Sequence, residues 1–318
     1  MSASVAIRSS AATAPAVRPS FVGTLRGELF KITRQRSVWI ATILLGGLIC
    51  APYLIYLAGR GIADSIASTP LDVLYTLMER DLEIVRAFSG IYLLVLAALV
   101  VGQEYQLGTI RILLGRGVGR LHLLGAKVLA LAIVAVIVLA AALALDVALA
   151  TVDLLILAHN LSAFSALTSQ FWTDTEWYIL SVAISMGATL LLGVAANVVG
   201  RSLAFGLGVS LVWFPADNIG SVLLALVGQF TNNTFWLKVS GYLLGPVLNV
   251  LPSLIVPARV ITIHGENGVQ TVSKPASTLG ITPLVDITNT HAWLVIAGYC
   301  AVFAIVAIVL TWRRDVLE

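Results

Sequence analysis

Two aspartates and one asparagine are the residues that could do chemistry inside the long apolar runs of this chain. Asp217 is the only acid well inside such a run, Asp146 lies near the end of another, and Asn197 lies in a third. An ionisable group buried in a membrane helix is costly and marks a transport pathway by default. We therefore predict a pathway or gating role for Asp217 and Asn197. The alternative for Asp217, which closely follows Pro215, is to accept hydrogen bonds from freed backbone amides.

Catalytic, metal and nucleotide sites are not expected. Carboxyl catalysis needs a second acid or a nucleophile paired with a base, and no such pair is evident. Cys50 and Cys300 lie far apart in apolar runs, and the four histidines form no cluster with metal-ligand spacing. The GxxxxGK[ST] phosphate-binding pattern is missing from the sequence. We predict no catalytic residue, no metal ligand and no cofactor held by this chain.

The composition is that of a membrane protein. Of 318 residues, 59% are hydrophobic and 11% are charged, and the mean hydropathy is +0.98. Soluble domains are about 45–50% apolar and about 25% charged. A water-soluble enzyme is therefore excluded, and we expect lipid rather than nucleic acid around this chain.

Six segments are long and apolar enough to cross a bilayer, which takes roughly 20 residues each. We predict an all-α integral membrane protein, because a single segment can satisfy its backbone in lipid only as a helix. The predicted spans are about 38–58, 86–102, 127–149, 178–199, 203–227 and 292–311. We expect Arg86 to snorkel from the end of the second span. The polar residues 1–19 are predicted to be a disordered tail, and 20–318 the membrane domain.

The basic residues predict the orientation. With the N-terminus in the cytoplasm, 13 of the 19 lysines and arginines lie on the cytoplasmic side, where loops are shorter. This agrees with the positive-inside rule, so both termini are predicted to be cytoplasmic.

Two outer segments lie outside the six spans. Residues 235–262 are almost long enough to cross, but Pro246, Pro252 and Pro257 interrupt them. A seventh crossing would also move the C-terminal arginines outside. We therefore predict a re-entrant segment between the fifth and sixth spans. The residues from Thr69 to Arg86 are predicted to form an outer interfacial helix leading into the second span.

An amphipathic helix is predicted before the first span. Phe21, Leu25, Leu29 and Ile32 recur at helical spacing, and Ser20 is a candidate N-cap. Cations flank the other face. Such a helix is expected at the inner interface, where it fixes topology and can flank a cytoplasmic partner.

The cytoplasmic loop 103–127 contains a second short helix. Ile110, Leu113 and Leu114 give it an apolar stripe, and Arg111, Arg116, Arg120 and Lys127 supply charge. A simple connector needs only a few polar residues. The pattern favours docking to another protein, with contact to lipid headgroups as the alternative.

These two segments resemble the membrane subunits of ABC-2-type ABC transporters. The opening motif E-x-x-K-x-x-R is present as Glu28, Lys31 and Arg34, which the resemblance assigns to an elbow helix. The middle motif E-x-x-x-G-T-x-x-x-L-L, followed by an Arg and a Lys, begins at Glu104 and ends at Lys127. Gly117-Val118-Gly119 stands where relatives often carry proline.

The resemblance implies that the loop is a coupling helix seated on a separate ATP-binding subunit, which would hold ATP and Mg²⁺. It also implies a second permease copy or a homologous permease, an export function and a multi-pass protein of the bacterial plasma membrane. The expected contacts with the ATP-binding subunit are Glu104, Gly108, Thr109, Arg111, Arg116 and Arg120. The competing hypothesis is a secondary transporter or channel with Asp217 in its pathway, although such proteins usually carry more intramembrane charge.

Overall fold

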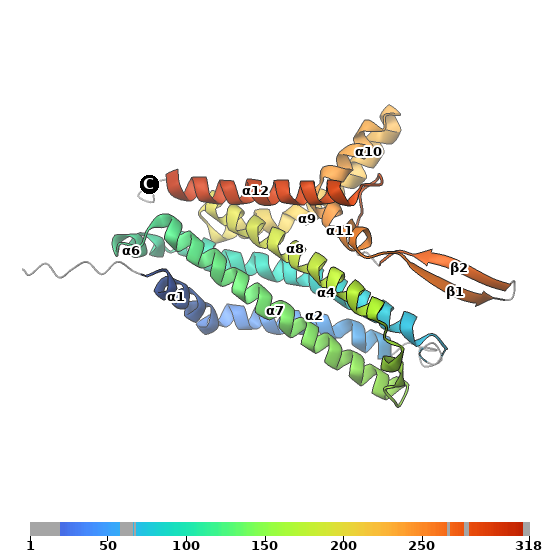
Figure 1. Ribbon diagram of the computed structural model, residues 1–318. Coiled ribbons are helices and arrows are strands. Elements are labelled where there is room, and N and C mark those ends of the chain that lie inside the picture. The colour runs from blue at the N-terminus through green and yellow to red at the C-terminus, as the bar shows by residue number, and fades with distance from the viewer. Residues whose placement is uncertain (1–19, 58–65, 67, 266–267, 277–279, 314–318) are drawn as a thin grey trace, which may run out of the picture.

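The computed structural model describes residues 20–57, 66, 68–265, 268–276 and 280–313, and the predicted tail 1–19 lies outside them. Six helices in this part of the chain are long and apolar enough to cross a membrane, as many as the sequence predicts. They pack as one elongated bundle (Figure 1). Their bounds are α2 Arg36–Leu57, α4 Pro70–Ala97 with its extension to Gln106, α7 Arg120–Leu157, α8 Ser169–Gly200, α9 Leu203–Thr231 and α12 Asn289–Arg313.

The second spanning helix differs from the prediction. One helical run extends from Pro70 to Gln106, through the π-helical turn η1 (Ala98–Gly102) and α5 (Gln103–Gln106). The predicted outer helix from Thr69 to Arg86 is therefore the first part of this run, and ion pairs hold its first turns against the rest of the protein. Arg259 lies 2.5 Å from Glu79 and 3.3 Å from Asp72.

Arg86 does not snorkel, contrary to the prediction. It is buried, and its Nη1 donates to Asn249 Oδ1 at 3.1 Å and to the Leu248 carbonyl at 3.4 Å. A guanidinium has five donors and no acceptor, so carbonyl oxygens inside the protein can replace water around it. Arg86 thereby connects α4 to α11 (Leu244–Ile255).

Helix α8 lies at the centre of the bundle. The small or polar residues Ser185, Thr189, Gly193 and Asn197 are all buried along it. At Gly193 an added Cβ would lie 2.9 Å from Ala97 Cβ, so α4 and α8 are in close contact there. Small side chains allow such close packing between membrane helices.

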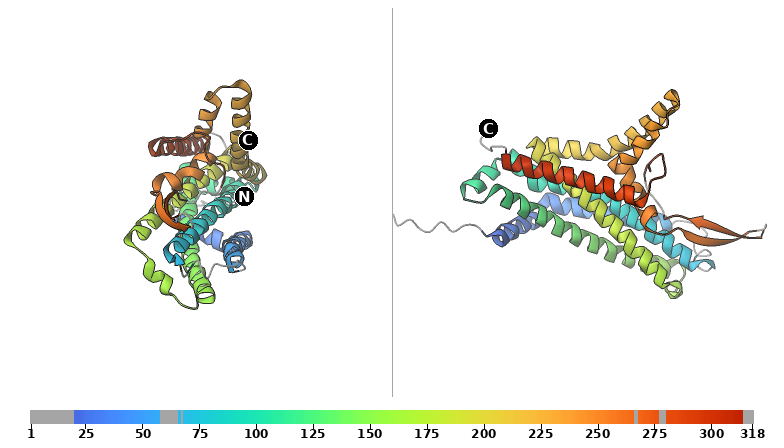
Figure 2. Two further views of the ribbon diagram at one scale, coloured as in Figure 1. Left: turned by 90° about the vertical axis from the view of Figure 1, so that its right-hand side faces the viewer. Right: turned by 45° about the horizontal axis from the view of Figure 1, so that its top comes forward.

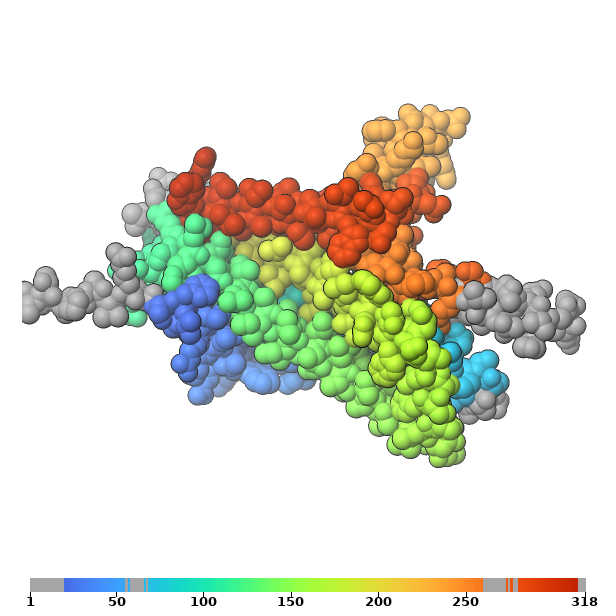
Figure 3. Space-filling model, viewed as in Figure 1, coloured from blue at the N-terminus to red at the C-terminus, as the bar shows by residue number. Residues whose placement is uncertain are grey.

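Short elements follow α9 in the chain. Helix α9 contains Pro215 and changes direction along its length, and its end projects sideways together with α10 (Figures 2 and 3). The elements are α10 (Phe235–Val239), the 3₁₀ turn η3 (Ser240–Tyr242) and α11 (Leu244–Ile255). The helical segments Phe235–Tyr242 and Leu244–Ile255 meet at a bend of 78°. This geometry fits either a broken span or a re-entrant loop.

A β-hairpin departs from the predicted all-α fold. Strand β1 (Arg259–Gly265) pairs antiparallel with β2 (Gly268–Lys274), with Arg259 opposite Lys274. The sequence does carry a signal, because β-branched residues are frequent on both sides of Asn267-Gly268. The hairpin projects from the end of the bundle that is opposite α6 (Figure 1).

Candidate functional site: the α1–α6 end of the bundle

Helix α1 (Phe21–Arg34) packs against the start of α7 at one end of the bundle. Ser20 caps it as predicted, with its Oγ accepting from the Gly23 amide at 3.1 Å. Ile32 is buried in the core, and the Phe21 ring meets His122 of α7 edge-on at 5.2 Å. Arg34 stays exposed, with its guanidinium 5.2 Å from the centre of the Phe30 ring.

Four charged side chains from three elements meet beneath this end of the bundle. They are Glu28 and Lys31 of α1, Glu104 of α5 and Lys127 of α7, and we call them the charge cluster. Lys127 Nζ lies 2.9 Å from Glu28 Oε2 and 2.7 Å from Glu104 Oε2. Lys31 Nζ lies 3.0 Å from Glu28 Oε2 and also pairs with Glu104. The two acids and two bases balance to zero net charge.

Lys127 completes its hydrogen bonding at the π-helical turn. Its ammonium has three donors. Besides its contacts with Glu28 and Glu104, it donates to the Val100 carbonyl in η1 at 3.0 Å. A π-helical turn alters the regular backbone pattern and often occurs at functional positions. Lys127 is only 2% exposed, so the whole ammonium is paired inside the protein. Lys127 is part of the family motif, but the sequence alone did not indicate that it belongs to the site.

The pKa of Lys31 is raised above its ordinary value of 10.5. Burial lowers this pKa, but the carboxylates of Glu104 and Glu28 outweigh that effect. Because the pKa of Lys31 is higher in the folded protein than in the unfolded chain, its protonated form stabilises the fold below pH 10.5. This stabilisation is lost as the pH rises through the pKa that Lys31 has in the folded protein. We expect unfolding temperature to fall above about pH 10.5 more steeply in the wild type than in Lys31→Met, as measured in detergent. Parallel pH profiles would contradict this.

Helix α6 (Thr109–Gly115) extends from the end of the bundle. Gly108 precedes it with a φ of +68°, a left-handed conformation that favours glycine. Thr109 Oγ1 donates to the Glu104 carbonyl at 3.3 Å. Gly117, with a φ of +84°, follows the helix, so Arg120 belongs to α7 instead. The predicted rod from Glu104 to Arg120 is therefore several short pieces.

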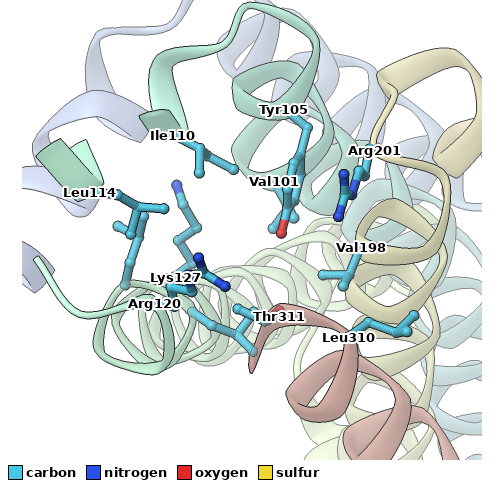
Figure 4. Close-up of a pocket in the computed structure, with 12 residues that line it drawn as sticks. Val101, Tyr105, Ile110, Leu114, Arg120, Lys127, Val198, Arg201, Leu310 and Thr311 are labelled. Carbon is cyan, nitrogen blue, oxygen red and sulfur yellow. The ribbon is translucent and has the colours of Figure 1, made fainter. Parts of the chain in front are cut away.

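The two faces of α6 have different roles in the structure. Ile110 and Leu114 point inward and meet Leu310 and Thr311 of α12 around a pocket of about 30 Å³ (Figure 4). A space of this size holds roughly one water molecule. On the outward side, Arg111 and Ile112 of α6 are exposed, Ile112 at 59%, and so are two residues that flank the helix, Leu107 at 65% and Arg116.

Besides Thr109, two charged residues among the predicted partner contacts interact within the chain. Glu104 is 7% exposed and belongs to the charge cluster. Arg120 is half-buried, and its Nη1 donates to the Trp312 carbonyl at 3.3 Å. The exposed Leu107 and Ile112 were not predicted, because the sequence shows only that apolar residues surround the helix and not which of them the bundle covers.

Neither Asp217 nor Asn197 belongs to the charge cluster or to the outward side of α6. Asp217 Oδ2 accepts a hydrogen bond at 2.9 Å from the amide of Gly245, in the first turn of α11, and not from an amide that Pro215 leaves free. Its neighbour Asn218 lines a cavity of about 340 Å³ between α4, α8, α9 and α11. Asn197 is fully buried and donates to the Gly193 carbonyl at 2.8 Å.

The fold is that of a multi-pass membrane protein, and no group of three or more metal-ligating side chains occurs among the described residues. Residues 24–232, from α1 through α9, match the model of the ABC-2 family transporter proteins. The chain belongs to this family, which confirms the resemblance and makes it a membrane permease of an ABC transporter. Family membership implies an ABC ATP-binding partner in general. No curated protein sequence matches the chain.

Proposed function

We propose that α6 receives movement from a separate ATP-binding subunit and passes it to the spanning helices. The observation that carries this proposal is the exposed outward face of α6, which combines Leu107 and Ile112 with Arg111 and Arg116. Apolar side chains at the centre of a contact supply binding energy, and charges around them supply complementarity and steering.

The charge cluster would transmit the movement. Glu104 lies four residues before Gly108 and is paired with Lys31 of α1 and Lys127 of α7. A displacement of α6 would therefore pull on α1 and α7 together. It would also act on α4, because one helical run leads from Gln106 back to Pro70 near the opposite end of the bundle.

The remaining assignments complete the proposed transporter. Helix α1 is the elbow helix at the inner membrane surface, both termini are cytoplasmic, and α10 with α11 forms the re-entrant segment. Two permease copies, or this chain with a homologous one, assemble with two ATP-binding subunits and export a substrate. The basic residues at the α6 end support this orientation.

Photo-crosslinking tests the docking face. A photoreactive phenylalanine analogue is placed at position 112, and at position 230 as a control, because Phe230 is 87% exposed in the last turn of α9. We expect position 112 to form an adduct with a polypeptide that carries a GxxxxGK[ST] motif, identified by mass spectrometry. Adducts with that polypeptide from position 230 but not 112 would refute the docking role.

Charge reversal on α6 gives a quantitative prediction. Arg111→Glu with Arg116→Glu is expected to lower recovery of the ATP-binding subunit with the tagged permease about tenfold or more, a loss of about 1.4 kcal/mol in binding. Lys238→Glu, an exposed lysine in α10, is the control and should leave recovery unchanged. Each variant is first checked for wild-type elution on size exclusion. Undiminished recovery with the double variant would contradict the proposal.

A further inference from the structure

A separate cavity lies near the end of the bundle opposite α6. It has a volume of about 430 Å³ and lies between α2, α4, α7 and α8, with the 3₁₀ turn η2 (Ser162–Ala166) at its edge. Pockets for small organic ligands usually measure about 300–1,000 Å³. The wall is mostly apolar and aromatic, and includes Leu74, Met78, Leu143, Phe164, Phe171 and Trp172.

Asp146 contributes a carboxylate to this wall. The residue is 8% exposed, and neither carboxylate oxygen has a hydrogen-bond partner among the described residues. The nearby Tyr53 hydroxyl donates instead to the backbone carbonyl of Asp146, at 3.1 Å. Burying a charge without a partner is strongly unfavourable. A positively charged ligand would remove that penalty.

The other charged group of the wall does not neutralise Asp146. Asp81 of α4 also lines the cavity, and its Oδ1 lies 3.6 Å from Nε of Arg80. Among the described residues that line the cavity, the charged side chains are the two acids Asp81 and Asp146. The cavity therefore combines a net negative wall with aromatic rings, whose faces attract cations.

The depth of Asp146 suits an amphipathic ligand. Nineteen residues of α7 separate it from Lys127, or about 28 Å at 1.5 Å per residue. The hydrocarbon core of a bilayer is about 30 Å thick. With Lys127 near one surface, Asp146 lies near the opposite headgroup boundary, where amphipathic cations accumulate.

We propose that this cavity, the Asp146 cavity, binds a lipophilic organic cation. The apolar body of the cation fills the space between Leu74, Leu143 and Phe171, and the positive centre of the cation lies beside the Asp146 carboxylate. The site is distinct from the docking face on α6, so binding requires neither ATP nor the ATP-binding subunit, and the proposal stands or falls independently of the coupling role.

A matched pair of ions tests the charge preference. Tetraphenylphosphonium is a permanent cation and tetraphenylborate an anion of nearly the same size and shape. Binding of both radiolabelled ions is measured by equilibrium dialysis with the purified chain in nanodiscs of zwitterionic phosphatidylcholine, against empty nanodiscs. We expect saturable binding of the cation, near one per chain, and no saturable binding of the anion.

Three variants locate the site. Asp146→Asn is expected to weaken cation binding about tenfold or more, which corresponds to 1.4 kcal/mol. Ala150→Phe fills the cavity without changing its charge and should have the same effect. Asp153→Asn removes another buried acid of α7 that lies outside the cavity wall, and should bind like the wild type. Asp146→Asn should keep or raise the unfolding temperature, because it removes an unpaired buried charge.

Several results would overturn the proposal. Equal binding of cation and anion, or wild-type affinity in Asp146→Asn, would make the cavity a space for lipid chains. An equal loss in Asp153→Asn would assign the effect to the overall charge of the bundle. Cation binding that survives Ala150→Phe would place the ligand elsewhere.

Discussion

Lys127→Met is expected to destabilise the folded protein more than any other single substitution at the α6 end. It leaves the carboxylates of Glu28 and Glu104 buried with only Lys31 between them, and Lys31 has a half-exposed side chain. Removing one partner from a buried ion pair typically costs about 3–5 kcal/mol, because the other charge is left uncompensated. We expect a loss of monodisperse protein and a markedly lower unfolding temperature, measured by fluorescence-detected size exclusion after heating.

Two further variants separate charge balance from side-chain loss. Lys238→Met removes an exposed lysine of α10 and should leave the unfolding temperature unchanged. Lys127→Met combined with Glu104→Gln leaves Glu28 and Lys31 as a balanced pair. The double variant should therefore be more stable than Lys127→Met alone, as expected for residues in one network. A double variant less stable than the single one would show that side-chain packing, and not charge, makes Lys127 important.

Gly206→Ala should also have a large effect, through steric overlap. A Cβ at position 206 would lie 2.1 Å from Asn197 Oδ1 and 2.8 Å from Asn197 Cα. The side-chain amide could rotate away, but the backbone atom can move only if α8 and α9 separate. Overpacking of this kind typically costs about 1–3 kcal/mol, and we expect the same assay to register it as a lower unfolding temperature.

Gly208→Ala is the matched control on the same helix. A Cβ at position 208 would meet no atom within 4 Å. Since alanine favours a helix over glycine by about 1 kcal/mol, this variant should be as stable as the wild type or slightly more so. If both alanine variants behaved alike, the close contact between Asn197 and Gly206 would not matter for stability.

These predictions concern residues along which the proposed movement would pass. The charge cluster connects α1, α5 and α7, and Asn197 lies where α8 meets α9 and the π-helical turn, with an added Cβ at Gly102 only 2.2 Å from its Oδ1. Asn197 therefore acts in the structure as a packing residue between helices. A gating role would require these contacts to rearrange, and the unfolding temperature of Gly206→Ala would measure how tightly they are packed.

The sequence by itself determined the membrane class, the number of spanning helices and the family. Each depends on local or summed properties: apolar length, overall composition and short motifs such as Glu28 to Arg34. The tertiary structure alone decided which polar residues are buried together. Glu28 and Lys127 are 99 residues apart, yet they form an ion pair, and no periodicity in either helix indicates that they meet.

The same physical reason explains why the prediction for Arg86 was wrong. Arg86 looks like a snorkelling residue until α11 supplies carbonyl oxygens for it, and only the tertiary structure brings Arg259 to Asp72 and Glu79 of α4. Likewise, Asp146 lies near the end of the predicted third span, and only the tertiary structure places it in the wall of a cavity between four helices. The energy of a polar group in a membrane protein depends on its partners, and those partners come from distant parts of the chain.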